Sequence, residues 1–216
     1  MSEGRSHMQK SCSGIILAGG RNTRFSGKDK AFISIGGKRI VDRIYHLFRE
    51  TFKEVIIVTN EPVKYLEWDA HIVTDIFPVR SSLTGIHAGL YYTQTLHAFI
   101  AACDVPFLQK DVVEAIVGAL SDDIDVVIPE TAAGLEPLCA AYSIRCLDTI
   151  HHNLTQKKMK IQMLFKRMRV KRISEKTLRR IDPQLVSFLN INSPPDLVRA
   201  EAVWSKLSNP NSTHNR

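Results

Sequence analysis

Short runs rich in valine and isoleucine alternate with helix-forming segments over the first 130 residues of the chain. The segments between these runs carry apolar residues at helical spacing, as at positions 40, 41, 44, 47 and 48. This alternation is typical of strand–helix–strand units, in which helices cover both faces of a parallel sheet. We therefore expect a three-layer α/β/α architecture with a mostly parallel, Rossmann-like sheet in a single domain. The expected strands are 14–17, 31–35, 54–58, 72–74, 98–103, 124–128 and 137–142, and the expected helices are 40–51, 83–95 and 112–120.

The remainder of the chain is less regular. Turn residues and apolar periodicity predict helices at 144–154, 158–168 and 195–207, and strands at 169–173 and 186–189. We expect one folded domain over residues 11–207. A tag-like, disordered N-terminus at 1–10 would precede it, and a disordered tail at 208–216 would follow it.

The composition excludes several classes of protein. Hydrophobic residues make up 44% of the chain, enough for a globular core. No apolar run approaches the roughly 18 residues of a membrane span, and the N-terminus lacks the apolar core of a signal peptide. The four cysteines form no CxxC pair, which argues against a zinc site. We expect a cytoplasmic monomer without membrane attachment.

The positive charge is concentrated in one segment. Residues 157–180 contain eleven lysines and arginines against a single acid, Glu175, whereas the rest of the chain holds 18 basic and 21 acidic residues. A local basic segment indicates a binding site or a docking face rather than a general nucleic-acid binder. No RNP, KH or zinc-knuckle pattern is present, so we expect no nucleic-acid partner.

The loop after the first strand combines glycines with cations. Gly19 and Gly20 allow a sharp turn that leaves backbone N–H groups free to approach a ligand. Positive charge follows within ten residues at Arg21, Arg24, Lys28 and Lys30. The spacing fits neither the P-loop nor the Rossmann GxGxxG pattern. A glycine turn with solvated basic side chains is the plain alternative, but the density of cations favours polyphosphate binding.

This loop suggests a division of roles. Backbone N–H groups of residues 18–21 would hold phosphates, while Arg24 and Lys30 would neutralise the charge that develops as pyrophosphate leaves. Polar residues also follow the later strands, with Asn60, Asp75 and Asp104 at three successive strand ends. In parallel sheets such ends form one edge where ligands bind.

Each of these polar residues has two interpretations. Asp104 precedes Val-Pro after a buried strand, where it can bind Mg²⁺ or cap a turn. Asp75 has the same ambiguity, and a carboxylate also accepts both donors of a guanine edge. Asn190 and Asn192 flank an apolar residue, so on an extended backbone both amides face one side. They would bind a metal or a nucleotide oxygen, or form an Asx turn.

Taken together, these motifs resemble the molybdenum cofactor guanylyltransferase family. The loop Leu17-Ala18-Gly19-Gly20 with Arg24 and Gly27-Lys28-Asp29-Lys30 resembles that family's LAGGxxxRxxGxDK signature. Further along the chain, Thr84–Leu90 is similar to the GPLxGIxxGL stretch, Ala102–Phe107 to CDxPF and Asn190–Pro194 to NxNTP. The ordered set covers residue 15 to about 197, nearly the whole folded chain.

The resemblance implies a nucleotidyltransferase-type fold and a specific reaction, the transfer of GMP from GTP to molybdopterin with Mg²⁺. The products would be molybdopterin guanine dinucleotide and pyrophosphate. The N-terminal part would bind GTP and the C-terminal part molybdopterin, with transient contacts to cofactor-biosynthesis proteins and acceptor oxidoreductases. The resemblance implies a catalytic set of Arg24, Lys30 and Asp104, a metal ligand in Asp104, and binding by Leu17, Ala18, Gly19, Gly20, Lys30, Asn60, Asp75, Asp104, Asn190 and Asn192.

The chain also departs from the family pattern. Ser81-Ser82-Leu83 replaces Gly-Pro-Leu, and Phe25-Ser26 replaces Met-Gly. Three alternatives remain open: a cytidylyltransferase acting on the same cofactor, which tends to carry LAAG; a sugar-phosphate nucleotidyltransferase; and a non-catalytic GTP-binding cofactor carrier. We further hypothesise that the basic segment, with Lys166 and Arg167 at its centre, contacts the anionic pterin or its acidic partners.

Overall fold

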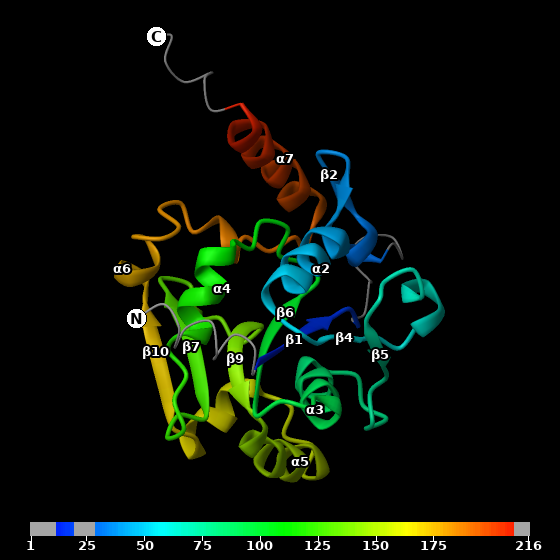
Figure 1. Ribbon diagram of the computed structural model, residues 1–216, viewed down its shortest axis with the longest axis vertical. Helices are drawn as coiled ribbons and strands as arrows, with labels where there is room; N and C mark the ends of the chain where they lie inside the picture. The colour runs from blue at the N-terminus through cyan, green and yellow to red at the C-terminus, as the bar shows by residue number, and fades with distance from the viewer. Residues whose placement is uncertain (1–11, 20–28, 210–216) are drawn as a thin grey trace.

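A computed structural model describes residues 12–19 and 29–209 of the chain. These residues form a central sheet with helices on both of its faces (Figure 1). The strands are β1 (Cys12–Leu17), β4 (Val55–Val58), β5 (His71–Val73), β6 (His97–Ala102), β7 (Val126–Thr131), β8 (Gly134–Leu135), β9 (Cys139–Ser143) and β10 (Val170–Ser174). Their order is β10-β7-β9-β6-β1-β4-β5, and β8 pairs with β7.

Strand β1 occupies the middle of this sheet. It pairs in parallel with β4 through Gly14–Leu17 and with β6 through its whole length. Only β9 and the short β8 run antiparallel to their neighbours within the described sheet. The expected mostly parallel α/β/α architecture is therefore confirmed. Because β4 and β6 lie on opposite sides of β1, the strand order reverses there, which is where such sheets bind ligands.

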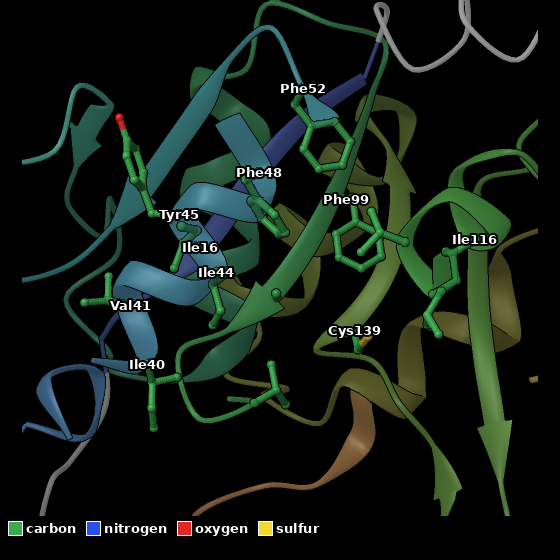
Figure 2. Packing of buried hydrophobic residues seen from close by; sticks show 14 of the residues in the cluster. Ile16, Ile40, Val41, Ile44, Tyr45, Phe48, Phe52, Phe99, Ile116 and Cys139 are labelled. Atoms are coloured by element: carbon green, nitrogen blue, oxygen red, sulfur yellow. The ribbon is translucent and has the colours of Figure 1, made fainter. Parts of the chain in front are cut away.

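The strands divide the core into two apolar clusters. Alternate residues point to opposite faces of a strand, so Ile16 and Ile57 belong to one cluster, while Ile15 and Ile56 belong to the other. One face is covered by α2 (Ile40–Thr51), α4 (Lys110–Val117) and α7 (Pro194–Ser208), and the other by α3 (Ser82–Tyr92) and α5 (Leu147–Thr155) (Figure 1). On the α2 face, the rings of Phe48 and Phe99 meet edge to face (Figure 2).

Three sequence predictions were wrong. Residues 31–35 form the 3₁₀ turn η1 (Lys30–Phe32) and the short strand β2 (Ser34–Ile35), which pairs with β3 (Lys38–Arg39) outside the main sheet. Residues 158–168, predicted to be an α-helix, contain the 3₁₀ segment η4 (Ile161–Arg167), whose Leu164 is buried in the core. Residues 186–189 form η5 (Val186–Phe188), held by the Asp182 carboxylate, which accepts hydrogen bonds from the N–H groups of Val186 and Ser187.

The remaining predicted elements are present with shifted ends. The sequence did not predict the short elements α6 (Glu175–Leu178) and η2 (Pro62–Tyr65). The predicted helix 144–154 begins with the single turn η3 (Ile144–Cys146), which precedes α5. Every helix in the described residues is too short or too polar to cross a membrane.

The final helix is anchored to the β2–β3 hairpin. Trp204 of α7 packs against Gly36 in the hairpin turn, and the Arg43 guanidinium lies 4.3 Å from the centre of the Trp204 ring. A Cβ on Gly36 would lie only 1.9 Å from Trp204 Nε1. Glycine is therefore required here both by its φ of 54° and by the indole that covers it.

The two hairpin glycines allow this contact to be tested. Gly36→Ala should lower the free energy of unfolding by about 1–3 kcal/mol more than Gly37→Ala, because only the first added methyl group collides with the indole. Gly37 also has a positive φ, of 78°, but no atom lies within 4 Å of its added Cβ, so it reports the backbone strain alone. Urea unfolding of both variants measures the difference, and equal losses would show that Trp204 moves aside freely.

Candidate functional site

A cavity of about 210 Å³ opens at the carboxyl ends of the central strands. It receives residues from the end of β1, the end of β4, the loop after β5, the start of α3 and the end of β6. Of the residues that the sequence singled out, it contains Leu17, Ala18, Gly19, Lys30, Asn60, Asp75 and Asp104. Parallel pairing explains this convergence, because it brings strand ends that are far apart in the sequence to one edge.

The end of β1 leaves fewer backbone N–H groups available for a ligand than the glycine pattern predicts. The N–H of Ala18 donates to the carbonyl of Val58 at 2.8 Å, which continues the β1–β4 ladder by one residue. This N–H is therefore unavailable for phosphate, and that part of the prediction was wrong. Gly19 is exposed at the cavity, so the free backbone begins there.

A buried tyrosine ties the end of β1 to the segment that carries Lys30. The Tyr65 hydroxyl lies 3.3 Å from both the Ala18 carbonyl oxygen and Asp29 Oδ2. The other oxygen of Asp29 caps η1 by accepting from the N–H of Ala31. Sequence reasoning missed Tyr65, because an isolated tyrosine in a polar turn carries no signal of long-range contact.

Lys30 connects the two ends of the domain. Its ammonium donates to Asn192 Oδ1 at 2.7 Å, across a separation of 162 residues. The loop that carries Asn192 is fixed in turn, because the N–H of Ile191 donates to the carbonyl of Asp104 and the Asp196 carboxylate accepts from the N–H of Asn192. The C-terminal loop is thus part of the site.

Asp104 lies close to this lysine. Burial raises the pKa of the Asp104 carboxyl above its usual range, and the charge of Lys30 partly opposes that rise. The carboxylate is therefore partly stripped of water and points to a place where a cation would be favourable.

A second carboxylate, that of Asp75, lines the same cavity. Asp75 Oδ2 accepts a hydrogen bond from Asn60 Nδ2 at 2.8 Å. Burial raises the pKa of Asp75, while Asn60 and the nearby charge of Arg80 act in the opposite direction. The amide of Asn60 thus orients the carboxylate that the sequence analysis considered for a guanine edge.

The first cavity continues into a groove. A second cavity shares Ser82, Asp104 and Leu138 with the first and adds Asn190 and Asn192. A third shares Glu136, Phe188 and Asn190 with the second and extends beneath α7 to Arg199. The sequence analysis missed Glu136 and Phe188, because both lie in segments without a recognisable motif.

Most of the basic segment lies apart from these cavities. Two further predicted residues, Gly20 and Arg24, fall outside the described residues. In the basic segment, Met159 contacts the Ser81 hydroxyl and Arg179 lines the third cavity. Lys166 and Arg167 line none of the three cavities. The cavities therefore do not support the hypothesis that these two side chains contact the pterin directly.

Comparison with known proteins agrees with this arrangement. Residues 14–184 match the family model described as the MobA-like NTP transferase domain. A molybdenum cofactor guanylyltransferase from Desulfosudis oleivorans is 48% identical over 190 residues, covering 88% of this chain and 94% of the relative. A probable molybdenum cofactor guanylyltransferase from Pelotomaculum thermopropionicum is 33% identical, covering 88% of this chain and 92% of the relative.

A solved structure supports the same relationship. The crystal structure of molybdopterin-guanine dinucleotide biosynthesis protein A from Archaeoglobus fulgidus superimposes with a TM-score of 0.79 at 28% identity, covering 90% of this chain and 99% of the other. The sheet order, the cavity at the strand ends and these relatives lead to one conclusion: the chain is a nucleotidyltransferase that belongs to the MobA-like NTP transferase family.

Proposed function

We propose that this enzyme transfers GMP from GTP to molybdopterin, forming molybdopterin guanine dinucleotide and pyrophosphate. The observation that carries the proposal is the convergence of Lys30, Asp75 and Asp104 in one cavity that opens into a second groove. The first space suits a nucleotide and the groove suits an acceptor, with Asp104 between them. The 48% identical molybdenum cofactor guanylyltransferase supports this choice of substrates.

The two ends of the cavity suit the two ends of GTP. Asp75, oriented by Asn60, offers oxygens to the N1–H and 2-amino donors of guanine, which cytosine lacks. Gly19 and Lys30 provide a backbone approach and a positive charge for the phosphates. The carboxylate therefore favours guanine over cytosine as the transferred base, in agreement with the LAGG loop.

Magnesium fits the donors at the centre of the site. Within residues 12–19 and 29–209 no group of three or more His, Cys, Asp or Glu side chains gathers around a point. Mg²⁺ needs no such group, because it binds one or two carboxylates and completes its shell with phosphate oxygens and water. Asp104 would hold it, with the amide oxygens of Asn190 and Asn192 nearby. The ion would neutralise charge on the phosphates.

The chemistry requires little from side chains beyond positioning. The terminal phosphate of molybdopterin is already ionised, so its oxygen can attack the α-phosphorus of GTP without a general base. The new P–O bond forms as the bond from the α-phosphorus to the bridging oxygen breaks, and pyrophosphate leaves with that electron pair. Lys30 stabilises the charge on the leaving group, and Asn192 holds the ammonium in place.

We assign the C-terminal half, with Asn190 and Asn192, to the acceptor. The exposed cations of residues 157–180 provide a face for acidic cofactor-handling proteins or acceptor oxidoreductases. Lys166 and Arg167 belong to that face.

A nucleotide panel tests the proposal. The purified protein with Mg²⁺ and molybdopterin should release pyrophosphate with GTP and negligibly with CTP or ATP. Release that requires molybdopterin excludes a non-catalytic carrier and a sugar-phosphate enzyme. Activity with CTP in place of GTP would overturn the base assignment, and no release with any nucleotide would overturn the reaction.

Lys30 should be the most sensitive side chain among those described. Lys30→Met removes the charge but keeps the stem, and it should lower kcat by roughly 10²–10³, the usual cost of losing one transition-state donor. Lys64→Met is the matched control, because Lys64 is exposed and pairs with Glu61 outside the cavity. A Lys30→Met enzyme with wild-type kcat would remove Lys30 from the mechanism.

The Asp104 carboxylate should lower the stability of the ligand-free protein, although the reaction needs it. A carboxyl whose pKa is raised by folding costs stability at every pH where it is ionised, and the cost vanishes below its unfolded pKa. Asp104→Asn should therefore raise the Tm at pH 8 and lose that advantage near pH 3.5, while turnover falls sharply. Thermal unfolding at both pH values without Mg²⁺ measures this effect, and a lower Tm at pH 8 would contradict it.

A further inference from the structure

Glu136 occupies the wall between the second and third cavities. It lies between β8 and β9 and lines both spaces. Its backbone is fixed on both sides, because its N–H donates to the carbonyl of Pro129 at 3.0 Å and its carbonyl accepts from the N–H of Cys139 at 3.1 Å. The side chain therefore projects from a rigid turn into the groove that leads away from Asp104.

The carboxylate of Glu136 is incompletely paired. Oε1 accepts a hydrogen bond from the Thr131 hydroxyl at 3.2 Å, and Oε2 has no hydrogen bond within the described residues. Burial raises the pKa of Glu136, and the nearby charge of Asp104 adds to the rise, against the bond from Thr131. No cation in the described chain forms a salt bridge with it. A half-buried carboxylate without a counter-charge is costly, and a ligand with N–H donors would relieve that cost.

An aromatic ring lines the same two cavities. Phe188 ends η5, whose backbone is held by the Asp182 carboxylate, and the Ser187 hydroxyl accepts from the N–H of Gln109. Phe188 is half-buried against the core and so has a fixed position. A flat heterocycle that enters the groove would thus meet an aromatic ring and a carboxylate.

We propose that Glu136 recognises the 2-amino-4-oxopyrimidine edge of the acceptor pterin, while Phe188 packs against its ring face. This inference rests on the proposed function, which supplies a pterin as the acceptor. The ring presents N3–H and a 2-amino group side by side, and a carboxylate accepts both. Guanine carries the same pair of donors, so Asp75 and Glu136 would serve equivalent edges on opposite sides of Asp104.

The inference predicts that substitutions in the groove change the KM for molybdopterin but not the KM for GTP. Glu136→Gln should raise the KM for molybdopterin roughly 10- to 100-fold, the effect of losing a hydrogen bond to a charged group, and leave the KM for GTP unchanged. Phe188→Leu should raise the same KM by a smaller factor. Glu130→Gln is the matched control, because Glu130 pairs with Arg172 at the surface and lines none of the three cavities.

Direct binding separates recognition from a structural role. Titration of the fluorescence of 6-hydroxymethylpterin, and of its 2-oxo analogue, which lacks the 2-amino donor, should show that the wild-type protein prefers the pterin. Glu136→Gln should abolish that preference. Loss of binding to both compounds with a lowered Tm would mean a folding defect, and the milder Glu136→Asp variant must then still weaken the preference for the inference to stand.

The outcomes distinguish this inference from the reaction itself. If the wild-type protein releases no pyrophosphate with GTP and molybdopterin, the proposed function fails. If it is active and Glu136→Gln keeps both the KM for molybdopterin and the pterin preference, only this inference fails. A variant that needs more Mg²⁺ but retains the preference would make Glu136 a metal ligand and also overturn the inference.

Discussion

The parallel pairing of β1 with β4 on one side and β6 on the other is the constraint on which the site depends. Parallel strands place all their carboxyl ends at one edge, and the change of direction in strand order at β1 opens a crevice there. Gly19, Asn60 and Asp104 follow these three strands directly. The pairing of the strands determines where each strand ends, and so it places these residues at the cavity whatever their side chains are.

A second constraint closes the site from the C-terminal side. The hydrogen bonds from Ile191 to the Asp104 carbonyl and from Lys30 to Asn192 attach the last loop of the domain to the end of β6 and to η1. Asp196 secures that loop, and α7, which follows it, packs on the β2–β3 hairpin through Trp204. The final helix therefore supports the position of Lys30 from a distance, through the loop at its start and the hairpin at its end.

The groove is also where the fold accepts an energetic cost. Burial raises the pKa of Asp75, Asp104 and Glu136 alike, and none of the three forms a salt bridge in the described chain. Other carboxylates are treated differently: Asp125 pairs with Arg145 and Arg169, and its pKa is lowered by them. Carboxylates that are desolvated and form no salt bridge are typical of sites that acquire their partners from a ligand.

By itself, the sequence determined the fold class and most members of the site. Alternating apolar runs predict the layered sheet. The ordered motifs identify Lys30, Asp104 and Asn192, and the predicted strand ends identify Asn60 and Asp75; all five line the connected cavities. Local pattern could not show that the Ala18 N–H is bonded within the ladder or that residues 161–167 and 186–188 form 3₁₀ segments. Nor could it show that Glu136 and Phe188 line the groove, or that Tyr65 connects the end of β1 to Asp29. Those features depend on contacts between residues distant in the chain, which only the tertiary structure decides, since packing and hydrogen bonding across the fold override the preferences of short segments.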